Sequence, residues 1–493
     1  MSLEEGNRKE LGLSEEHRQW LFKFYEKNGF EPVWFNDSSL NEKGKLLRKT
    51  LDQSIYLGIP GSRLRFPFRA AKNPVIKELM ITAQSALLIQ DLKTGMISDS
   101  AKKYRTQRFA DLPLFDSLIA HDENIPYVRF FIDHSFSDTN YRFLSEHLYK
   151  FCSAYPLDRK TFDIKPFSVD SNKTIIGANA ALRSKGYLSE NDRDQVRIDA
   201  ALKLFQKHNG LKPDGKVGKY TASALNESTY NKVLRACLAM DKMRRHGRFP
   251  KKYLQVNLPE YKLRFFARDS LRSVHNIICG KPEHATPELR SKLHSIIVYP
   301  FWNVPHSIAR NEILPAVKSN RNYLKKNNYK IYRGNVEVDP LHVNWRRITA
   351  SNFPYKVVQQ PGPGNSLGVI KFEFFNNYSV YIHDTPAKSL FRSDVRCFSH
   401  GCMRCEEPIE LGKKILDHDS LKYASRSVKG VGNSITSDSL DSLIGAGNHH
   451  VIKLMDHIPV FVEYLTVVAD RERMVFHPDI YKRDEDYLEF MRD

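Results

Sequence analysis

The sequence predicts a multidomain α+β protein. It would combine a mostly helical N-terminal scaffold, a small three-helix module, and a β-sandwich-like domain with an inserted helical lid subdomain. At 493 residues, the chain exceeds what one hydrophobic core normally supports. Helical spacing of apolar residues gives way to short alternating segments after about Lys251. We expect a helical scaffold at 1–165, the three-helix module at 166–230, a helical connector at 231–250, the sheet-rich domain at 251–468 with its insert at 302–352, and a C-terminal tail at 469–493.

The first 150 residues follow a helical pattern. His17, Leu21, Phe24 and Tyr25 recur at helical spacing, and 76–92 repeats the pattern. That second stretch includes the longest apolar region of the chain, but polar residues interrupt it well short of the roughly 18 to 20 apolar residues of a membrane span. We therefore expect it to be a core helix.

Helical segments and a glycine-rich turn define the module that follows, at about 174–228. One predicted helix carries Ala201, Leu204, Phe205 and His208 on one face. The turn at 214–218 then separates it from a last helix. A unit of about 55 residues is marginally stable alone, so we expect contacts with adjacent parts of the chain to stabilise it.

Short strands dominate the rest of the chain, with one interruption. The pattern predicts strands at 253–258, 262–266, 274–279, 295–299, 369–374, 379–382 and 460–467. Many short strands separated by turns are typical of a sandwich or a barrel-like domain. Ile308, Ile313, Leu314 and Val317 fall at helical spacing, which predicts an inserted helical subdomain.

The net charge favours an anionic partner. Lys and Arg number 76 against 57 Asp and Glu, giving +19, which suits nucleic acid, anionic lipid or a carboxylate-rich polymer. The basic residues are dispersed, as on an ordinary solvated surface, and no nucleic-acid-binding motif accompanies them. No signal peptide is visible, and we expect that an export signal has been removed from the natural N-terminus.

The six cysteines are too sparse for a disulfide framework in a chain of this size. The spacing of Cys397, Cys402 and Cys405 matches the start of an iron–sulfur ligand set, but no fourth cysteine follows. A zinc site completed by His400 or His418 is an alternative. We expect neither a metal nor another cofactor.

Cys402 has the surroundings of a reactive thiol. Gly401 before it permits a sharp turn whose amides can face a ligand, and His400 and Arg404 bring positive charge that favours thiolate. A helix is predicted to begin near Pro408. That start lies too far along the chain for its dipole to activate the thiol strongly.

His383 is the candidate base, nineteen residues upstream at the end of a predicted strand. A Cys–His pair needs a group that orients the imidazole ring. Asp384 is adjacent, but neighbouring strand residues face opposite ways, so we expect its main-chain carbonyl to orient the ring rather than its carboxylate. The glycine-rich stretch at 361–368 lacks the register of a nucleotide-binding loop and is predicted to line the site as a loop.

These residues together resemble the L,D-transpeptidase family, which cross-links peptidoglycan. The resemblance rests on 381–386, Leu390–Phe391, Asp394, Arg396 and 398–404, with further matches at Gly280, Thr286–Pro287, 301–308 and 359–368. Tyr25 and 32–34 are similar to the N-terminal scaffold of the large multidomain Gram-negative members. The series from Leu182 to Asn226 resembles a peptidoglycan-binding domain.

The resemblance implies that Cys402 attacks the third residue of a stem peptide, that His383 is the base, and that a second stem accepts the acyl group in a 3→3 cross-link. It implies oxyanion or loop support from Ser399, His400, Gly401, Arg404 and Asp384, and possible substrate lining by Tyr381, Thr385, Trp302, Gly364 and Asn365. It further implies that 302–352 forms a lid. The protein would act in the periplasm or envelope and contribute to cell shape. Its partners would be peptidoglycan stem peptides and glycan, and carbapenems would acylate it. Cys397 and Cys405 depart from the family pattern and leave a regulatory disulfide open.

Rival functions remain open from the sequence. The same thiol chemistry would serve an L,D-carboxypeptidase, or an enzyme that attaches or releases wall-linked protein. A non-catalytic wall-binding protein that keeps the fold is an alternative of another class.

Overall fold

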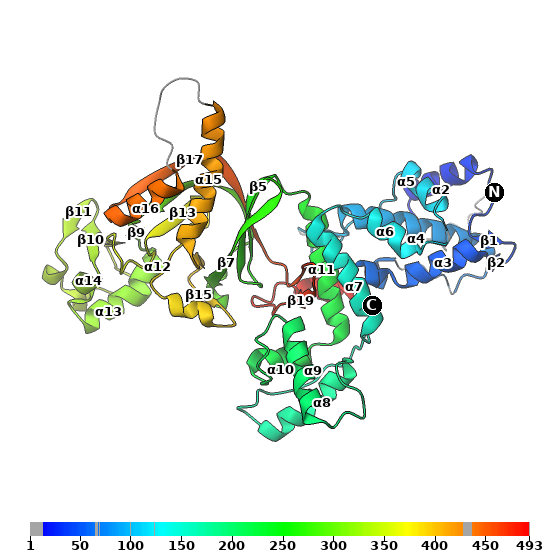
Figure 1. The fold of residues 1–493 in the computed structure, drawn as a ribbon, viewed down its shortest axis with the longest axis horizontal. Coiled ribbons are helices and arrows are strands. Elements are labelled where there is room, and N and C mark those ends of the chain that lie inside the picture. Colours follow the sequence, from blue (N-terminus) through cyan, green and yellow to red (C-terminus); the bar gives the residue numbers. More distant parts are fainter. Residues whose placement is uncertain are drawn as a thin grey trace. The chain divides into compact units, whose positions relative to one another are not determined.

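The computed structural model describes residues 13–64, 68, 70–98, 100–122, 124–426 and 436–492, without the side chains of 420–426. The chain forms two compact units (Figure 1). Unit 1 contains the residues up to Arg248 together with those from Leu465 onward, and unit 2 runs from Phe249 to Tyr464. The mixture of a helical N-terminal region and a sheet-rich domain confirms the predicted α+β class.

Helices build the core of unit 1. Its helices outside the three-helix module are α2 (Glu15–Lys27), α3 (Glu42–Asp52), α4 (Pro74–Thr94), α5 (Leu112–Ile119), α6 (Tyr127–Asp133), α7 (Thr139–Ala154), α11 (Thr229–His246) and α17 (Glu485–Met491). Two short hairpins, β1–β2 (Phe35–Asn36, Ser39–Leu40) and β3–β4 (Ile97–Ser98, Lys103–Tyr104), join them. Almost all of α4 is buried, including polar side chains such as Glu78 and Asp91, which confirms the predicted core helix. Among the described residues, no helix has the length and apolar character needed to cross a membrane.

The three-helix module has its own small core. It comprises α8 (Ser171–Ser184), α9 (Gln195–His208) and α10 (Lys219–Asn226). The buried Gln206 amide holds the turn, since its Nε2 donates to Asp214 Oδ1 at 3.0 Å and its Oε1 accepts from the Gly215 amide at 2.9 Å. Asp214 and Gly215 of the glycine-rich turn therefore have a structural role.

The C-terminal residues return to unit 1 from Leu465 onward, three residues before the predicted boundary of the sheet-rich domain at 468. They form the hairpin β18–β19 (Val467–Ala469, Met474–Phe476) and α17, whose apolar side chains join the helical core. The Arg235 guanidinium of α11 pairs with Glu227 at 2.9 Å and with Asp484 at 3.8 Å. The predicted tail is thus an integral part of unit 1.

A nine-stranded sheet forms unit 2. Its strands run in the order β15-β7-β16-β14-β13-β8-β17-β5-β6, and an additional β6–β7 pairing curls the sheet toward a barrel. Their bounds are β5 (Lys252–Asn257), β6 (Lys262–Ala267), β7 (Ser270–Gly280), β8 (Leu289–Val298), β13 (Ile370–Phe374), β14 (Ile382–His383), β15 (Cys397–Ser399), β16 (Met403–Cys405) and β17 (His450–Glu463). Alternating burial along β6 and β13 matches the predicted period of two.

The strand predicted at 379–382 is wrong in its bounds. The strand expected at 379–382 is only the two-residue β14, because Ser379 has a left-handed φ of +56°. The Asn376 side chain also holds this turn, donating to the Val380 carbonyl at 2.8 Å and accepting from the Val380 amide at 3.1 Å. The strand therefore starts three residues late and ends on His383.

One helix packs against this sheet, and a second helix packs against the first. Helix α15 (Pro408–Arg426) begins at the predicted proline and buries Leu411, Ile415 and Leu416. Helix α16 (Ser437–Ala446) packs against α15. The start of α15 lies beyond the end of β16 at Cys405.

The sequence predicted a helical insert, but the insert contains both helices and a sheet. Its helical part is α12 (His306–Ile308), the π-helical turn Ala309–Ile313, α13 (Leu314–Ser319) and α14 (Tyr323–Lys326). It also contains a four-stranded sheet in the order β11-β10-β12-β9, with bounds Val336–Val338, Tyr329–Arg333, Lys356–Gln359 and Trp302–Asn303. Because Gln359 pairs with Trp302, the insert starts and ends on neighbouring strands and extends to 359 rather than 352.

Candidate active site

Strand pairing brings the predicted cysteine and histidine together. β14 and β16 are parallel, with Ile382 opposite Met403 and His383 opposite Arg404. The Met403 amide donates to the Tyr381 carbonyl at 3.0 Å. Cys402 immediately precedes this pairing, so its backbone runs beside the 381–383 segment.

His383 is buried and neutral. Its Nδ1 lies 2.5 Å from the Asp384 main-chain oxygen, the contact predicted from the sequence. A carbonyl only accepts, so Nδ1 carries the proton and Nε2 is left as an acceptor. Burial, with a further contribution from the positive charge of Arg404, lowers the pKa of His383 to about 3. A neutral imidazole can take a proton.

The Cys402 thiol is half-buried and protonated at rest. Its Sγ lies 3.8 Å from the Ser379 carbonyl oxygen. Burial raises the pKa of the thiol above its ordinary value, although hydrogen bonding from Tyr381 and the charges of Lys371 and Arg404 oppose that rise. Burial thus disfavours both the thiolate of Cys402 and the imidazolium of His383, and proton transfer would accompany attack on a bound carbonyl.

Tyr381 touches both groups of the pair. Its hydroxyl is one of the groups that lower the pKa of the Cys402 thiol, and its ring centroid lies 5.6 Å from that of His383. The Lys371 ammonium sits over the Tyr381 ring at 4.1 Å. Sequence reasoning placed Tyr381 and Trp302 only as lining residues and missed Lys371. Lys371 pairs with His383 across β13 and β14, and that register is a tertiary feature.

The loop before Cys402 is held by its own hydrogen bonds. Ser399 Oγ donates to the Cys402 carbonyl at 2.5 Å and accepts from the Gly401 amide at 3.1 Å. Thr286 Oγ1 donates to the Gly401 carbonyl at 2.8 Å. Gly401 has φ +116°, which favours glycine. The Gly401 amide and the Ser399 hydroxyl are thus engaged within the loop.

His400 points to the insert rather than to the thiol. Its Nε2 lies 2.6 Å from Glu312 Oε1, on the π-helical turn. Its ring also lies 5.2 Å from that of His284. The sequence led us to expect His400 to support the thiolate, whereas the structure pairs it with the insert.

Asp384 and Thr385 shape the backbone after His383. The Asp384 carboxylate accepts from the Val369 amide at 3.0 Å and forms an ion pair with Lys388. Thr385 is buried, and its Oγ1 accepts from the Ala387 amide at 3.2 Å. Both side chains fix the turn that carries the His383 ring.

Gly364 and Asn365 belong to a self-contained loop. The buried Asn365 amide donates to the Pro300 carbonyl at 3.1 Å and to the Gln360 carbonyl at 2.9 Å. The Gly364 carbonyl accepts from Gln359 Nε2 at 3.2 Å. Asn365 was predicted as a lining residue, but its side chain serves to hold the loop.

The cysteines beside Cys402 do not form a metal cluster. The Cys405 side chain is buried with its Sγ 3.2 Å from the Glu406 carbonyl oxygen. Cys397 instead faces Cys279. In the described part of the chain, no group of three or more His, Cys, Asp or Glu side chains is arranged to hold a metal ion.

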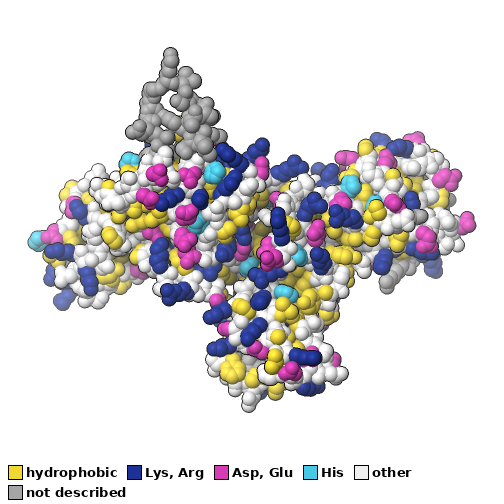
Figure 2. Space-filling model, viewed as in Figure 1, with side chains coloured by type: hydrophobic (Ala, Val, Ile, Leu, Met, Phe, Trp, Pro, Cys, Tyr) yellow, Lys and Arg dark blue, Asp and Glu magenta, His cyan; other side chains and the backbone are white. Residues whose placement is uncertain are grey.

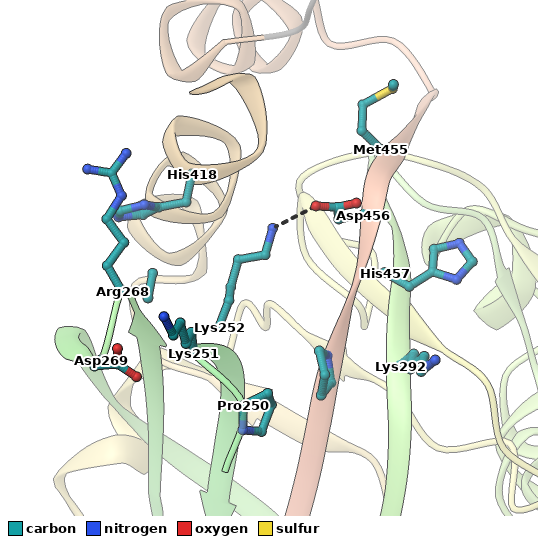
Figure 3. Close-up of a pocket in the computed structure, with 12 residues that line it drawn as sticks. Pro250, Lys251, Lys252, Arg268, Asp269, Lys292, His418, Met455, Asp456 and His457 are labelled. Carbon is teal, nitrogen blue, oxygen red and sulfur yellow. Dashed lines mark ion pairs between the residues drawn. The ribbon is translucent and has the colours of Figure 1, made fainter. Parts of the chain in front are cut away.

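A separate cavity of about 1040 Å³ opens in unit 2 (Figure 3). Lys251, Lys252, Arg268, Lys292, His418 and Asp456 are among its lining residues, and Lys252 Nζ lies 3.9 Å from Asp456 Oδ2. Lys292 lies six residues along β8 from Val298, which is the end of β8 beside the His383 pairing. That separation is roughly 20 Å along a strand, so the cavity is not the thiol site.

Comparison with known proteins finds family models that match three parts of the chain. Residues 251–422 match the model of the L,D-transpeptidase catalytic domain, 19–130 that of a "Scaffold domain", and 172–225 that of a "Putative peptidoglycan binding domain". A curated relative from Haemophilus influenzae, described as "Putative L,D-transpeptidase", is 32% identical over 231 residues. That alignment covers 46% of this chain and 44% of the relative, so the chain aligns with less than half of the relative's length.

The structure is thus a sheet-rich domain in which a glycine turn at Gly401 leads into the strand paired with the one that ends on His383. With residues 251–422 matched, this chain carries a catalytic domain of the L,D-transpeptidase family, and the resemblance seen in the sequence is confirmed.

Proposed function

We propose that the chain is an L,D-transpeptidase that forms 3→3 cross-links in peptidoglycan through a thioacyl-enzyme at Cys402. The observation that carries the proposal is the pairing of β14 with β16, which sets the Cys402 backbone next to the segment of the carbonyl-anchored His383, within the matched catalytic domain. A thiol with an adjacent base suits acyl transfer. The family-model match for residues 172–225 supports a peptidoglycan partner.

The reaction would begin with attack of Cys402 Sγ on the carbonyl of the third stem residue. The thiol proton would pass to His383 Nε2 as the carbon–sulfur bond forms, and then to the leaving amine of the terminal D-alanine. A second stem's amine would attack the thioester and give its proton to His383, which would pass that proton to the Cys402 sulfur as the carbon–sulfur bond breaks.

Fewer groups would be available to donate hydrogen bonds to the oxyanion than the sequence indicated. The Gly401 amide already donates to Ser399 Oγ, so the Cys402 amide is the proposed main-chain donor. Tyr381 would then stabilise the developing thiolate through its hydroxyl. Arg404 and Lys371 would lower the cost of a negative charge at this sulfur.

The insert would act as a lid over the thioester. The contact between Glu312 and His400 joins it to the loop that carries Cys402. A covered thioester is protected from water, which favours transfer to an amine over hydrolysis.

The surface charge fits a carboxylate-bearing wall polymer. Figure 2 shows Lys and Arg side chains scattered over the visible face, interspersed with acidic ones. Such a distribution suits a long anionic polymer better than one small anion. Action at the cell wall, in the periplasm or envelope, follows from this proposal.

Intact-mass measurement after carbapenem exposure tests the thiol chemistry. We expect one covalent adduct on the wild type, none on Cys402→Ala, and an unchanged adduct on Cys405→Ser, a matched control in the same strand region. Absence of any adduct, or an adduct that survives Cys402→Ala, contradicts the proposal and favours a non-catalytic wall-binding protein.

Tetrapeptide stem fragments test the acceptor. Mass spectrometry should find cross-linked dimers together with released D-alanine. If the products are only monomers shortened by one residue, the enzyme is an L,D-carboxypeptidase instead.

A further inference from the structure

Two cysteines outside the Cys402 site lie against each other in the sheet of unit 2. Cys279 is near the end of β7, and Cys397 is the first residue of β15. The two strands are parallel, with Cys397 directly opposite Cys279. Their Sγ atoms are 3.6 Å apart, and the two sulfurs are not joined by a disulfide in this structure.

We propose that Cys279 and Cys397 form a reversible disulfide that pins the strand leading into the Cys402 loop. Paired residues on neighbouring strands have Cα atoms about 4.8 Å apart, which lies within the roughly 4.4 to 6.8 Å that disulfides span. Rotation of the two side chains is then sufficient to bring the sulfurs from 3.6 Å to bonding distance.

The two thiols have different surroundings, which assigns their roles. Cys397 is half-buried, and the Tyr261 hydroxyl lies 3.3 Å from its Sγ. A hydrogen bond with the Cys279 thiol, assisted by Tyr261 and the charge of Arg396, lowers the pKa of Cys397 despite its burial. Cys279 is fully buried. Cys397 is therefore the thiol that meets an external oxidant, and Cys279 is the resolving thiol.

The oxidant is a disulfide, either of low molecular weight or on a partner protein. The Cys397 thiolate attacks one sulfur of that disulfide, forming a mixed disulfide and releasing one thiolate. Cys279 then loses its proton and attacks the Cys397 sulfur, releasing the second thiolate. The two cysteines lose two electrons, the oxidant becomes two thiols, and the two thiol protons go to the released thiolates.

The bond would act on the neighbouring loop through β15. Ser399, two residues after Cys397, holds the Cys402 carbonyl and the Gly401 amide. Since β15 has only three residues, fixing Cys397 to β7 also restrains Ser399. The bond would join residues 118 positions apart, enclosing the insert and His383, so it would also stabilise unit 2 against unfolding.

Equilibration of the full chain in glutathione and glutathione disulfide buffers, followed by unfolding, alkylation and intact-mass analysis, tests this. We expect alkylatable thiols to fall from six to four, with a mass about 2 Da lower before alkylation because two hydrogens leave. Peptide mapping should recover the segments of Cys279 and Cys397 joined. Amide hydrogen exchange at 399–402 should slow in the oxidised protein, and thermal unfolding should shift upward.

Cys279→Ser and Cys397→Ser should each abolish the linked peptide, whereas Cys405→Ser should retain it. Four results would overturn the proposal: six thiols at every buffer ratio, a lasting glutathione adduct on Cys397, a joined peptide containing Cys402, or unchanged exchange at 399–402 in the oxidised wild type. The wild-type titration is decisive even where a variant does not fold. Because no readout uses enzymatic activity, its failure is distinct from failure of the proposed transpeptidation.

Discussion

His400 Nε2 lies 2.6 Å from Glu312 Oε1, and this contact joins the glycine turn before Cys402 to the π-helical turn of the insert. The two side chains are 31% and 52% exposed. Exposed pairs of this kind contribute about 0 to 1 kcal/mol to folding. The contact therefore has little weight in global stability, but it lies where the insert meets the reactive loop.

Glu312→Gln should loosen that junction without unfolding the protein. Loss of the carboxylate removes the charge that attracts the His400 ring, so amide hydrogen exchange at 306–319 should rise severalfold while the melting temperature stays nearly constant. Glu337→Gln is the matched control, since Glu337 pairs with Lys330 at 3.0 Å on the β10–β11 hairpin of the insert. Equal exchange in the two variants would mean that the His400 contact does not hold the insert.

Tyr381→Phe should make the Cys402 thiol less reactive. Hydrogen bonding from the Tyr381 hydroxyl lowers the pKa of that thiol, so its loss should raise the pKa and reduce the thiolate fraction at pH 8. We expect a severalfold slower alkylation of Cys402 by iodoacetamide, with the rate still climbing above pH 9. The exposed Tyr378, changed to Phe, is the control. A rate equal to wild type would show that the hydroxyl does not tune the thiol.

The sequence predicted the proximity of His383 and Cys402 because both belong to local patterns, a strand end and a glycine turn. It could not predict the roles of Lys371, Glu312 or Cys279, which depend on register between segments far apart in the chain. Residue type alone also predicted that His400 and Asn365 contribute to the reactive site. A sequence does not reveal which group a polar side chain hydrogen-bonds with in the fold.

His383 should make unit 2 less stable in acid. Its pKa is about 3 in the folded protein, against about 6.5 for an unfolded histidine. The unfolded chain therefore binds the extra proton first, so this residue's contribution is fully present above pH 6.5 and is lost as pH falls toward 3. At about 1.4 kcal/mol per pKa unit, the loss is a few kcal/mol.

The measurement is the free energy of unfolding of wild type and His383→Gln between pH 7.5 and pH 4.5, with the exposed His449→Gln as control. The difference between wild type and His383→Gln should shrink as pH falls, and His449→Gln should follow wild type. In a carbon-13 NMR spectrum, the ring signals of His383 should be those of a neutral imidazole at pH 5. A ring that titrates near pH 6.5 contradicts the buried, neutral state.

Gly401→Ala should damage the reactive loop through its backbone. A Cβ at position 401 would meet only ordinary contacts, the nearest at 3.7 Å to the His284 carbonyl oxygen, so space is not the obstacle. The obstacle is φ +116°, a conformation that costs a residue with a side chain about 1 to 3 kcal/mol. Relaxation of that strain would pull the Gly401 amide from Ser399 Oγ and move the Cys402 sulfur.

Gly364→Ala is the matched control for this change, because its Cβ would have open space and its φ lies outside the left-handed region. We expect Gly401→Ala to lower the melting temperature and slow Cys402 alkylation, while Gly364→Ala leaves the melting temperature within error of wild type. If both alanine variants have the melting temperature of the wild type, the loop tolerates a side chain at 401. The conformation of Gly401 is then not what positions the thiol.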